Sequence, residues 1–237
     1  MNDSQRTDSQ PTDSQPNYLL RLYRDEVAPQ SALVLAAHNT VRAVYVVAGG
    51  LRVSGDALEA TLGANSAYTS RSGLRLKSGH LATTLLRWEL TAGTAAPAVA
   101  TGTGVSSTLL LEAAMTLDPA RQYLLRGDRV DFPPGGEALT HTHQGGSIRC
   151  LLFGGIDIHT QGTVHHYAPL EPWFEAGSDP VYAATSTNAA SAFARVMILP
   201  RELLGKSSIS YVNADDLNKP KNQKYQVFID TPIDLPK

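Results

Sequence analysis

Two histidines one residue apart, His141 and His143, carry the clearest chemical signal in this sequence. In an extended strand, alternate side chains point to one face, so the two imidazoles are expected to lie side by side. Imidazole is a common ligand of transition metals in proteins. The pair therefore predicts half of a site for a divalent transition metal such as iron, manganese, zinc or nickel.

The residues after the histidines predict a hairpin. Gly145-Gly146 favours a reversal of the chain, and the apolar run at residues 148–153, which ends at Gly154, favours the returning strand. The stretch resembles the first signature of the cupin family, in which a glycine, a His-x-His pair, a glutamate and a second glycine follow one another at set spacing. Gly135 or Gly136, the two histidines and Gly154 match this pattern, whereas Ser147 stands at the glutamate position.

The rest of the chain shows short, β-rich apolar runs punctuated by glycine. Residues 43–48 align with residues 148–153 at an offset of 105 residues, which indicates two copies of one domain. The resemblance and the repeat together imply an all-β bicupin, with two tandem barrels of the jelly-roll-like double-stranded β-helix type. The predicted division is a disordered tail at 1–17, an N-terminal degenerate cupin domain at 18–103, a C-terminal cupin domain with the His-x-His motif at 104–200, and an extension at 201–237.

The first copy lacks the metal-binding residue types. The same offset places Ala36 opposite His141, His38 opposite His143 and Arg42 opposite Ser147. Alanine offers no ligand atom, and the guanidinium of Arg42 stays protonated and repels a cation. We therefore expect no metal in the first barrel and a structural role for His38, and we favour an anion near Arg42 if this barrel binds any ligand.

The second cupin signature should supply a further histidine, but Val181 stands at its position. A transition metal held by imidazole normally has at least three protein ligands. We expect Glu175, in the matching strand, to be the third, which would give the two-histidine, one-carboxylate set of non-haem iron oxygenases. The alternatives left open are His159, His165, His166 and Gln144.

Arg149 and Trp173 are the predicted substrate-pocket residues. At the mouth of a barrel, a guanidinium beside aromatic surface would suit a small, partly apolar carboxylate or carbonyl compound. The expected partner is thus a small molecule. No Gly-rich phosphate loop, serine nucleophile elbow or CxxC pair is present to indicate nucleotide or thiol chemistry.

Composition narrows the class of protein further. The chain has 237 residues, 42% of them hydrophobic, and a formal net charge of -2 with no long basic run, which disfavours nucleic acid as a partner. The single Cys150 lies in an apolar run and predicts a buried thiol without a disulfide framework. No apolar segment approaches the ~20 residues that span a bilayer, and no secretory signal is evident. We therefore expect a cytoplasmic protein without a membrane partner.

Three hypotheses follow. The first is a metal-dependent cupin enzyme, most similar to dioxygenases, with isomerase or lyase chemistry as alternatives that the resemblance allows. The second is a non-catalytic bicupin that binds or senses a small molecule and whose metal site has decayed. The third is a structural protein that forms a homodimer through its sheet edges.

Overall fold

A computed structural model describes residues 17–37, 39–55, 58–93, 95–96 and 100–237. In this part of the chain the regular structure is strand, apart from two short 3-10 helices, η1 (Arg201–Leu203) and η2 (Ala214–Asn218). The strands are β1 (Tyr18–Val27), β2 (Ala32–Leu35), β3 (Thr40–Ala48), β4 (Gly50–Gly55), β5 (Leu58–Gly63), β6 (Ser66–Ser70), β7 (Leu74–Ser78), β8 (Thr83–Ala92), β9 (Val105–Met115), β10 (Tyr123–Phe132), β11 (Glu137–His143), β12 (Ser147–Phe153), β13 (Ile156–Thr160), β14 (Thr163–Tyr167), β15 (Pro172–Glu175), β16 (Val181–Thr185), β17 (Ser191–Pro200), β18 (Ile209–Tyr211) and β19 (Lys224–Ile233).

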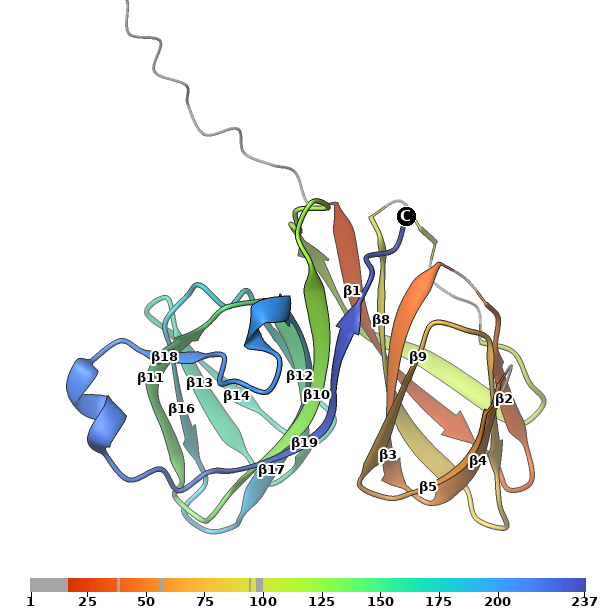
Figure 1. Cartoon of the computed structure of the whole chain (residues 1–237). Coiled ribbons are helices and arrows are strands. Elements are labelled where there is room, and N and C mark those ends of the chain that lie inside the picture. Colours follow the sequence, from red (N-terminus) through yellow and green to blue (C-terminus); the bar gives the residue numbers. More distant parts are fainter. Residues whose placement is uncertain (1–16, 38, 56–57, 94, 97–99) are drawn as a thin grey trace, which may run out of the picture.

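The strands form two barrels that lie side by side (Figure 1). The first barrel consists of sheets with strand orders β6-β3-β8-β1-β9 and β2-β7-β4-β5, and the second of β15-β12-β17-β10-β19 and β14-β13-β16-β11-β18. The first-named sheets of the two barrels match strand for strand. The second-named sheets match when the order of the first barrel is read from β5 to β2, and β18 is an addition to the second barrel. The expected all-β fold with two tandem barrels is confirmed.

Strand register shows that the repeat is longer than the sequence comparison indicated. Arg21 on β1 lies opposite Glu112 on β9, and Arg126, 105 positions later on β10, lies opposite Asp230 on β19. In both barrels the strand register shifts one residue further on, after Leu22 on β1 and after Gly127 on β10. The sheets thus join β9 to the first barrel and β19 to the second, whereas the predicted domain ranges end at residues 103 and 200. Where the domains divide stays a prediction.

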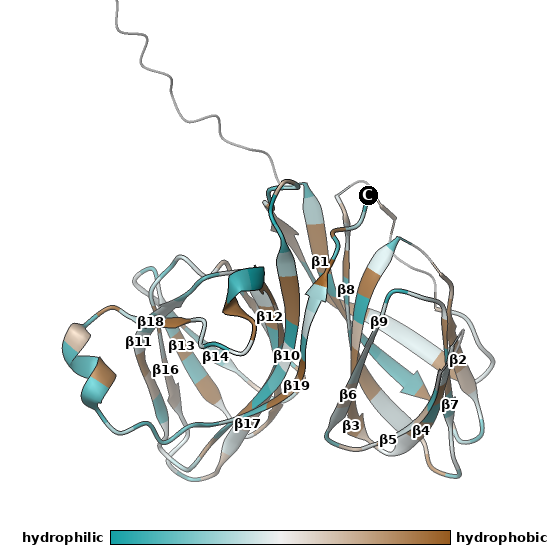
Figure 2. Ribbon diagram, in the orientation of Figure 1, coloured by the Kyte–Doolittle hydropathy of each residue, from teal (hydrophilic) through white to brown (hydrophobic). Residues whose placement is uncertain are grey.

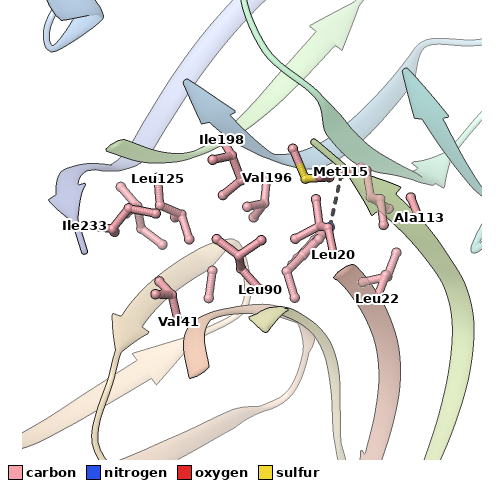
Figure 3. Packing of buried hydrophobic residues seen from close by; sticks show 14 of the residues in the cluster. Leu20, Leu22, Val41, Leu90, Ala113, Met115, Leu125, Val196, Ile198 and Ile233 are labelled. Atoms are coloured by element: carbon pink, nitrogen blue, oxygen red, sulfur yellow. Dashed lines mark hydrogen bonds between the residues drawn. The ribbon is translucent and has the colours of Figure 1, made fainter. Parts of the chain in front are cut away.

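A large apolar cluster joins the barrels. Leu20 and Leu90 of the first barrel pack with Val196 and Ile198 of the second (Figure 3). The sheets that contain β8 and β17 pack against each other through one face and line the barrel interiors with the other. Both strands are therefore buried along almost their whole length. Hydrophobic and hydrophilic segments alternate along β10 (Figure 2), and the polar residues Arg126 and Asp128 share one face of it.

Two expectations fall largely outside the described residues. The predicted disordered tail covers residues 1–16, which are not described, and Asn17, whose side chain donates a 2.7 Å hydrogen bond to the carbonyl of Leu117. His38 also lies outside the described residues. Of the helices in the described part, none is long and apolar enough to cross a bilayer.

Candidate functional site

The two histidines converge inside the second barrel. His141 and His143 lie on β11 and are 7% and 5% exposed. Their Nε2 atoms are 3.2 Å apart, and their rings are nearly perpendicular. Strand alternation therefore brings the imidazoles together as predicted. Val181, at the position of the missing family histidine, pairs with His141 across β11 and β16, so an apolar side chain occupies that side of the pair.

The environment keeps both imidazoles neutral. Nδ1 of His141 lies 2.8 Å from the carbonyl oxygen of Leu139, which only accepts, so this nitrogen carries the proton and Nε2 carries a lone pair. Nδ1 of His143 lies 3.2 Å from Oγ of Ser208. Burial lowers the pKa of both rings, and the nearby positive charges of Arg149 and Arg195 lower the pKa of His143 further.

Two buried guanidinium groups flank the histidines. Arg195 is bound to Asp128 through Nε at 2.7 Å and Nη2 at 3.0 Å, and its remaining Nη1 lies 3.5 Å from Nε2 of His143. Arg149 forms an ion pair with Glu175 at 2.7 Å and donates a 2.6 Å hydrogen bond to Oγ of Ser147. Burial lowers the pKa of Arg149 to about 10, although Glu175 opposes the shift. Ser147, which stands where the cupin signature has a glutamate, thus accepts a hydrogen bond from Arg149.

Both carboxylate oxygens of Glu175 are already engaged. Oε2 pairs with Arg149, and Oε1 accepts a 2.9 Å hydrogen bond from Nε1 of Trp173. Among the described residues, no group of three or more histidine, cysteine, aspartate or glutamate side chains is placed to hold a metal ion. The third ligand therefore stays a prediction, because the structure brings together the histidine pair but not the full set.

The predicted pocket residues, Arg149 and Trp173, are buried in the barrel at 2% and 3% exposure. Trp173 stacks on Tyr167 and meets the edge of Phe193, which are contacts typical of a core aromatic residue. Neither residue lines the cavity that adjoins the histidines. Their role in substrate binding stays a prediction.

The remaining histidine candidates lie in the hairpin formed by β13 and β14. The ring of His159 packs against Tyr182, and His166 forms an exposed ion-pair contact with Asp157. His165 is also exposed. Their contacts are those of surface side chains.

A cavity of about 410 Å³ lies at the side of the barrel, separated from the histidine pair by Arg195 and Ser208. It lies between β10, β19 and the loop that precedes β18. Two of its wall residues, Arg195 and Ser208, also contact His143. Its lining comprises Arg126, Asp128, Arg195, Gly205, Lys206, Ser207, Ser208, Ile209, Tyr225, Val227 and Asp230.

Arg126 fixes the loop that covers this cavity. Its Nη2 and Nη1 donate hydrogen bonds to the carbonyl oxygens of Leu203 and Lys206 at 2.7 and 2.8 Å, and its Nε pairs with Asp230. Sequence reasoning missed Arg126 although a signal existed: Tyr-Leu-Leu-Arg occurs at residues 18–21 and again at 123–126, at the offset of the repeat. The repeated motif would have placed Arg126 in the barrel.

Comparison with known proteins identifies the fold. No family model and no curated protein matches the sequence. Among solved structures, a deletion mutant of Bacillus subtilis oxalate decarboxylase OxdC matches with a TM-score of 0.61 at 10% identity, over 84% of this chain and 73% of that one. The Lactobacillus farciminis oxalate decarboxylase formate complex matches with a TM-score of 0.63 at 10% identity, over 84% and 82%. AerE from Microcystis aeruginosa matches with a TM-score of 0.52 at 14% identity, over 80% and 96%.

The chain has the cupin fold, in two copies. The resemblance inferred from the His-x-His stretch is thus confirmed at the level of fold. At these identities the likeness shows the fold alone.

The spacing of the two Nε2 atoms matches that of two ligands on one divalent metal ion. Two imidazole nitrogens bound to one tetrahedral zinc ion at about 2.1 Å lie about 3.4 Å apart, and the two Nε2 atoms here are separated by 3.2 Å. The hydrogen bond to Leu139 places the proton of His141 on Nδ1 and so gives its Nε2 a lone pair that could bind a metal. The hydroxyl of Ser208 can accept a hydrogen bond from Nδ1–H of His143 when Nε2 of that ring acts as a ligand.

Proposed function

We propose that the second barrel is the working site of a cupin-type metalloenzyme that acts on a small organic molecule. His141 and His143 would hold one divalent transition metal, iron, manganese, zinc or nickel, and such an ion supplies Lewis-acid or oxygen-activating chemistry. The observation that carries this proposal is the convergence of two buried, neutral imidazoles on one point, with their Nε2 atoms 3.2 Å apart.

The protein's own residues prepare this site. The carbonyl of Leu139 and the hydroxyl of Ser208 orient the two rings. Glu175 is the proposed third ligand, and binding through it requires the hydrogen bond from Trp173 or the ion pair with Arg149 to be exchanged. The cavity beside Ser208 and Arg195 would admit the substrate to one side of the histidines.

The reaction we propose is oxygenase-like, as the resemblance to cupin dioxygenases suggests, with isomerase or lyase chemistry as the alternatives. One structural neighbour, a Bacillus subtilis oxalate decarboxylase with 9% identity to this chain, has Mn(II) centres. That neighbour supports a divalent metal in a shared fold and does not identify the substrate here. Cytoplasmic location and a homodimer also stay predictions.

A second candidate is a bicupin that binds a small molecule without turning it over. It is favoured by two observations: the oxygens of Glu175 are engaged, and the guanidinium Nη1 of Arg195 lies 3.5 Å from His143 Nε2. A positive charge so close to the pair disfavours a bare cation and favours an anion.

Metal analysis of untagged protein separates the two candidates. We expect near-stoichiometric metal in the unchanged chain and its loss in His141→Ala and His143→Ala, because each variant leaves one imidazole to hold the ion. His166→Ala, at an exposed histidine, is the matched control and should keep its metal. Metal content that does not respond to either barrel substitution would refute the metalloenzyme. Oxygen uptake with β-diketones and phenolic ketones then tests the oxygenase assignment.

A further inference from the structure

We propose that the cavity beside the histidines binds a monocarboxylate with a small apolar body, held by Arg195 and Lys206. This inference rests on the proposed function in taking the second barrel as the working site. It narrows the expected substrate class to a monocarboxylate and adds two recognition residues. Neither residue belongs to the predicted pair of pocket residues, Arg149 and Trp173.

The charges of the cavity wall favour a single negative charge. Its lining includes three cationic side chains, Arg126, Arg195 and Lys206, and two anionic ones, Asp128 and Asp230. Each aspartate forms hydrogen bonds with an arginine through both of its oxygens. One positive charge therefore remains uncompensated within the lining, and a monoanion would neutralise it.

Free donors on the wall show where the carboxylate would bind. Two nitrogens of Arg195 are bound to Asp128, whereas Nη1 has only a long 3.5 Å contact with His143. Lys206 is exposed, and among the described residues its amine has no ion-pair or hydrogen-bond partner. A carboxylate accepts strong charge-assisted hydrogen bonds from both groups. Binding at Arg195 places the carboxylate beside Ser208 and the histidine pair.

The rest of the lining supplies apolar contact. Ile209, Val227 and the ring of Tyr225 form walls of the same cavity, and the Tyr225 ring centroid lies 5.8 Å from the guanidinium carbon of Arg195. The volume of about 410 Å³ is in the lower part of the range for small-molecule sites. A compact branched or aromatic acid matches both the walls and the charge.

Binding measurements with benzoate and benzamide test the assignment, since the two probes share a shape and differ in charge. We expect calorimetry on the full chain, after the metal has been stripped, to show saturable binding of benzoate and none of benzamide. Equal binding of both probes, or the absence of saturable binding by benzoate and isovalerate at millimolar concentration, would overturn the proposal. Tighter binding of phenyl phosphate than of benzoate would overturn the monoanion assignment.

Variants identify the recognition residues. Lys206→Ala should weaken benzoate binding about two- to fivefold, the range for one exposed ion pair. Arg195→Lys keeps the charge, but one ammonium cannot bind both oxygens of Asp128 and also donate to the ligand, so this variant should weaken binding more strongly. Lys224→Ala, at an exposed lysine outside the cavity lining, is the matched control and should bind as the unchanged chain does. Unaltered affinity in Lys206→Ala and in a folded Arg195→Lys would refute the assigned residues.

Metal content, measured on the same preparations, separates the two proposals. A chain that takes up metal at the histidines but binds no benzoate refutes the carboxylate site alone. A chain that binds benzoate after stripping, while the histidine substitutions leave its metal content unchanged, refutes the metalloenzyme alone.

Discussion

The interiors of the two barrels differ where their strands correspond. In the first barrel, Arg42 and Glu89 lie opposite each other on β3 and β8 and form a fully buried ion pair at 2.7 Å. At the same place in the second barrel, Ser147 lies opposite Met197 on β12 and β17. Since neither replacement is charged, this part of the second barrel has no ion pair between its central strands.

An arginine and aspartate pair is common to both interiors. Arg87 binds Asp25 in the first barrel, as Arg195 binds Asp128 in the second, each through two nitrogens. In the first barrel Arg87 also contacts Glu89, which links the four charged groups into one buried network. The second barrel instead places its remaining polar groups around the histidines and the cavity. One copy of the fold thus has a continuous buried network of charges between its strands, and the other gathers polar groups around a histidine pair and the adjoining cavity, where we propose that a ligand binds.

The largest expected effect tests whether the first network is structural. Glu89→Leu leaves Arg42 without its carboxylate, and removing one partner of a buried ion pair destabilises a protein by about 3–5 kcal/mol. Urea denaturation should show this loss in the free energy of unfolding. The double variant Arg42→Met/Glu89→Leu should recover much of it, because no unpaired charge is then buried.

Glu112→Ala is the control for this experiment. Glu112 also pairs with a buried arginine, Arg21, but its side chain is 41% exposed, so water replaces the lost partner. Its effect should be far smaller than that of Glu89→Leu. If the two single variants are equally stable, the network in the first barrel is not what holds its strands.

The second barrel should instead show a pH dependence set by its histidines. Because burial lowers the pKa of both rings in the folded chain, below about pH 6.5 the unfolded chain binds protons that the folded chain does not. Stability is then present above that pH and lost on acidification, by up to about 1.4 kcal/mol per pH unit for each ring. Urea denaturation of metal-stripped protein between pH 7 and 5.5 measures this slope.

A variant assigns the slope to the pair. His141→Gln/His143→Gln replaces both rings with groups that do not titrate, so its stability should vary much less over this interval. The histidines on β13 and β14 remain in the variant and serve as the internal control. An unchanged slope would show that the acid sensitivity arises outside the second barrel.

The features that could be predicted from the sequence are those that depend on strand periodicity and on the repeat. Alternation on one strand sufficed for the convergence of His141 and His143, and the repeat sufficed for two barrels. The contact between Arg195 and Asp128 joins residues 67 positions apart and depends on the pairing of β10 with β17. Ser208 likewise reaches His143 from 65 positions away, out of a segment predicted only as an extension. Such contacts follow from register, which short motifs do not specify.

Glu175 shows the same limit at closer range. Its strand was predicted correctly, because it matches the second signature of the family. Its partner was not predicted, since the engagement with Arg149 depends on how β12 and β15 align, with Ser147 opposite Glu175. The sequence therefore suggested that the carboxylate of Glu175 was available to a metal, whereas in the structure it is paired with Arg149.

The smallest expected effect concerns the contact between the two barrels. Nε1 of Trp88, on β8 of the first barrel, donates a 3.0 Å hydrogen bond to the carbonyl of Ile148 on β12 of the second. Trp88→Phe keeps an aromatic ring in the apolar cluster but leaves that buried carbonyl without this donor, which should destabilise the protein by about 1–3 kcal/mol. If the barrels unfold as one unit, a single denaturation transition moves to lower urea. If they unfold separately, loss of the contact should broaden the transition or split it in two. The order of the two transitions would then show whether the first barrel, with its charged network, or the second barrel, with its histidine pair, is the more stable.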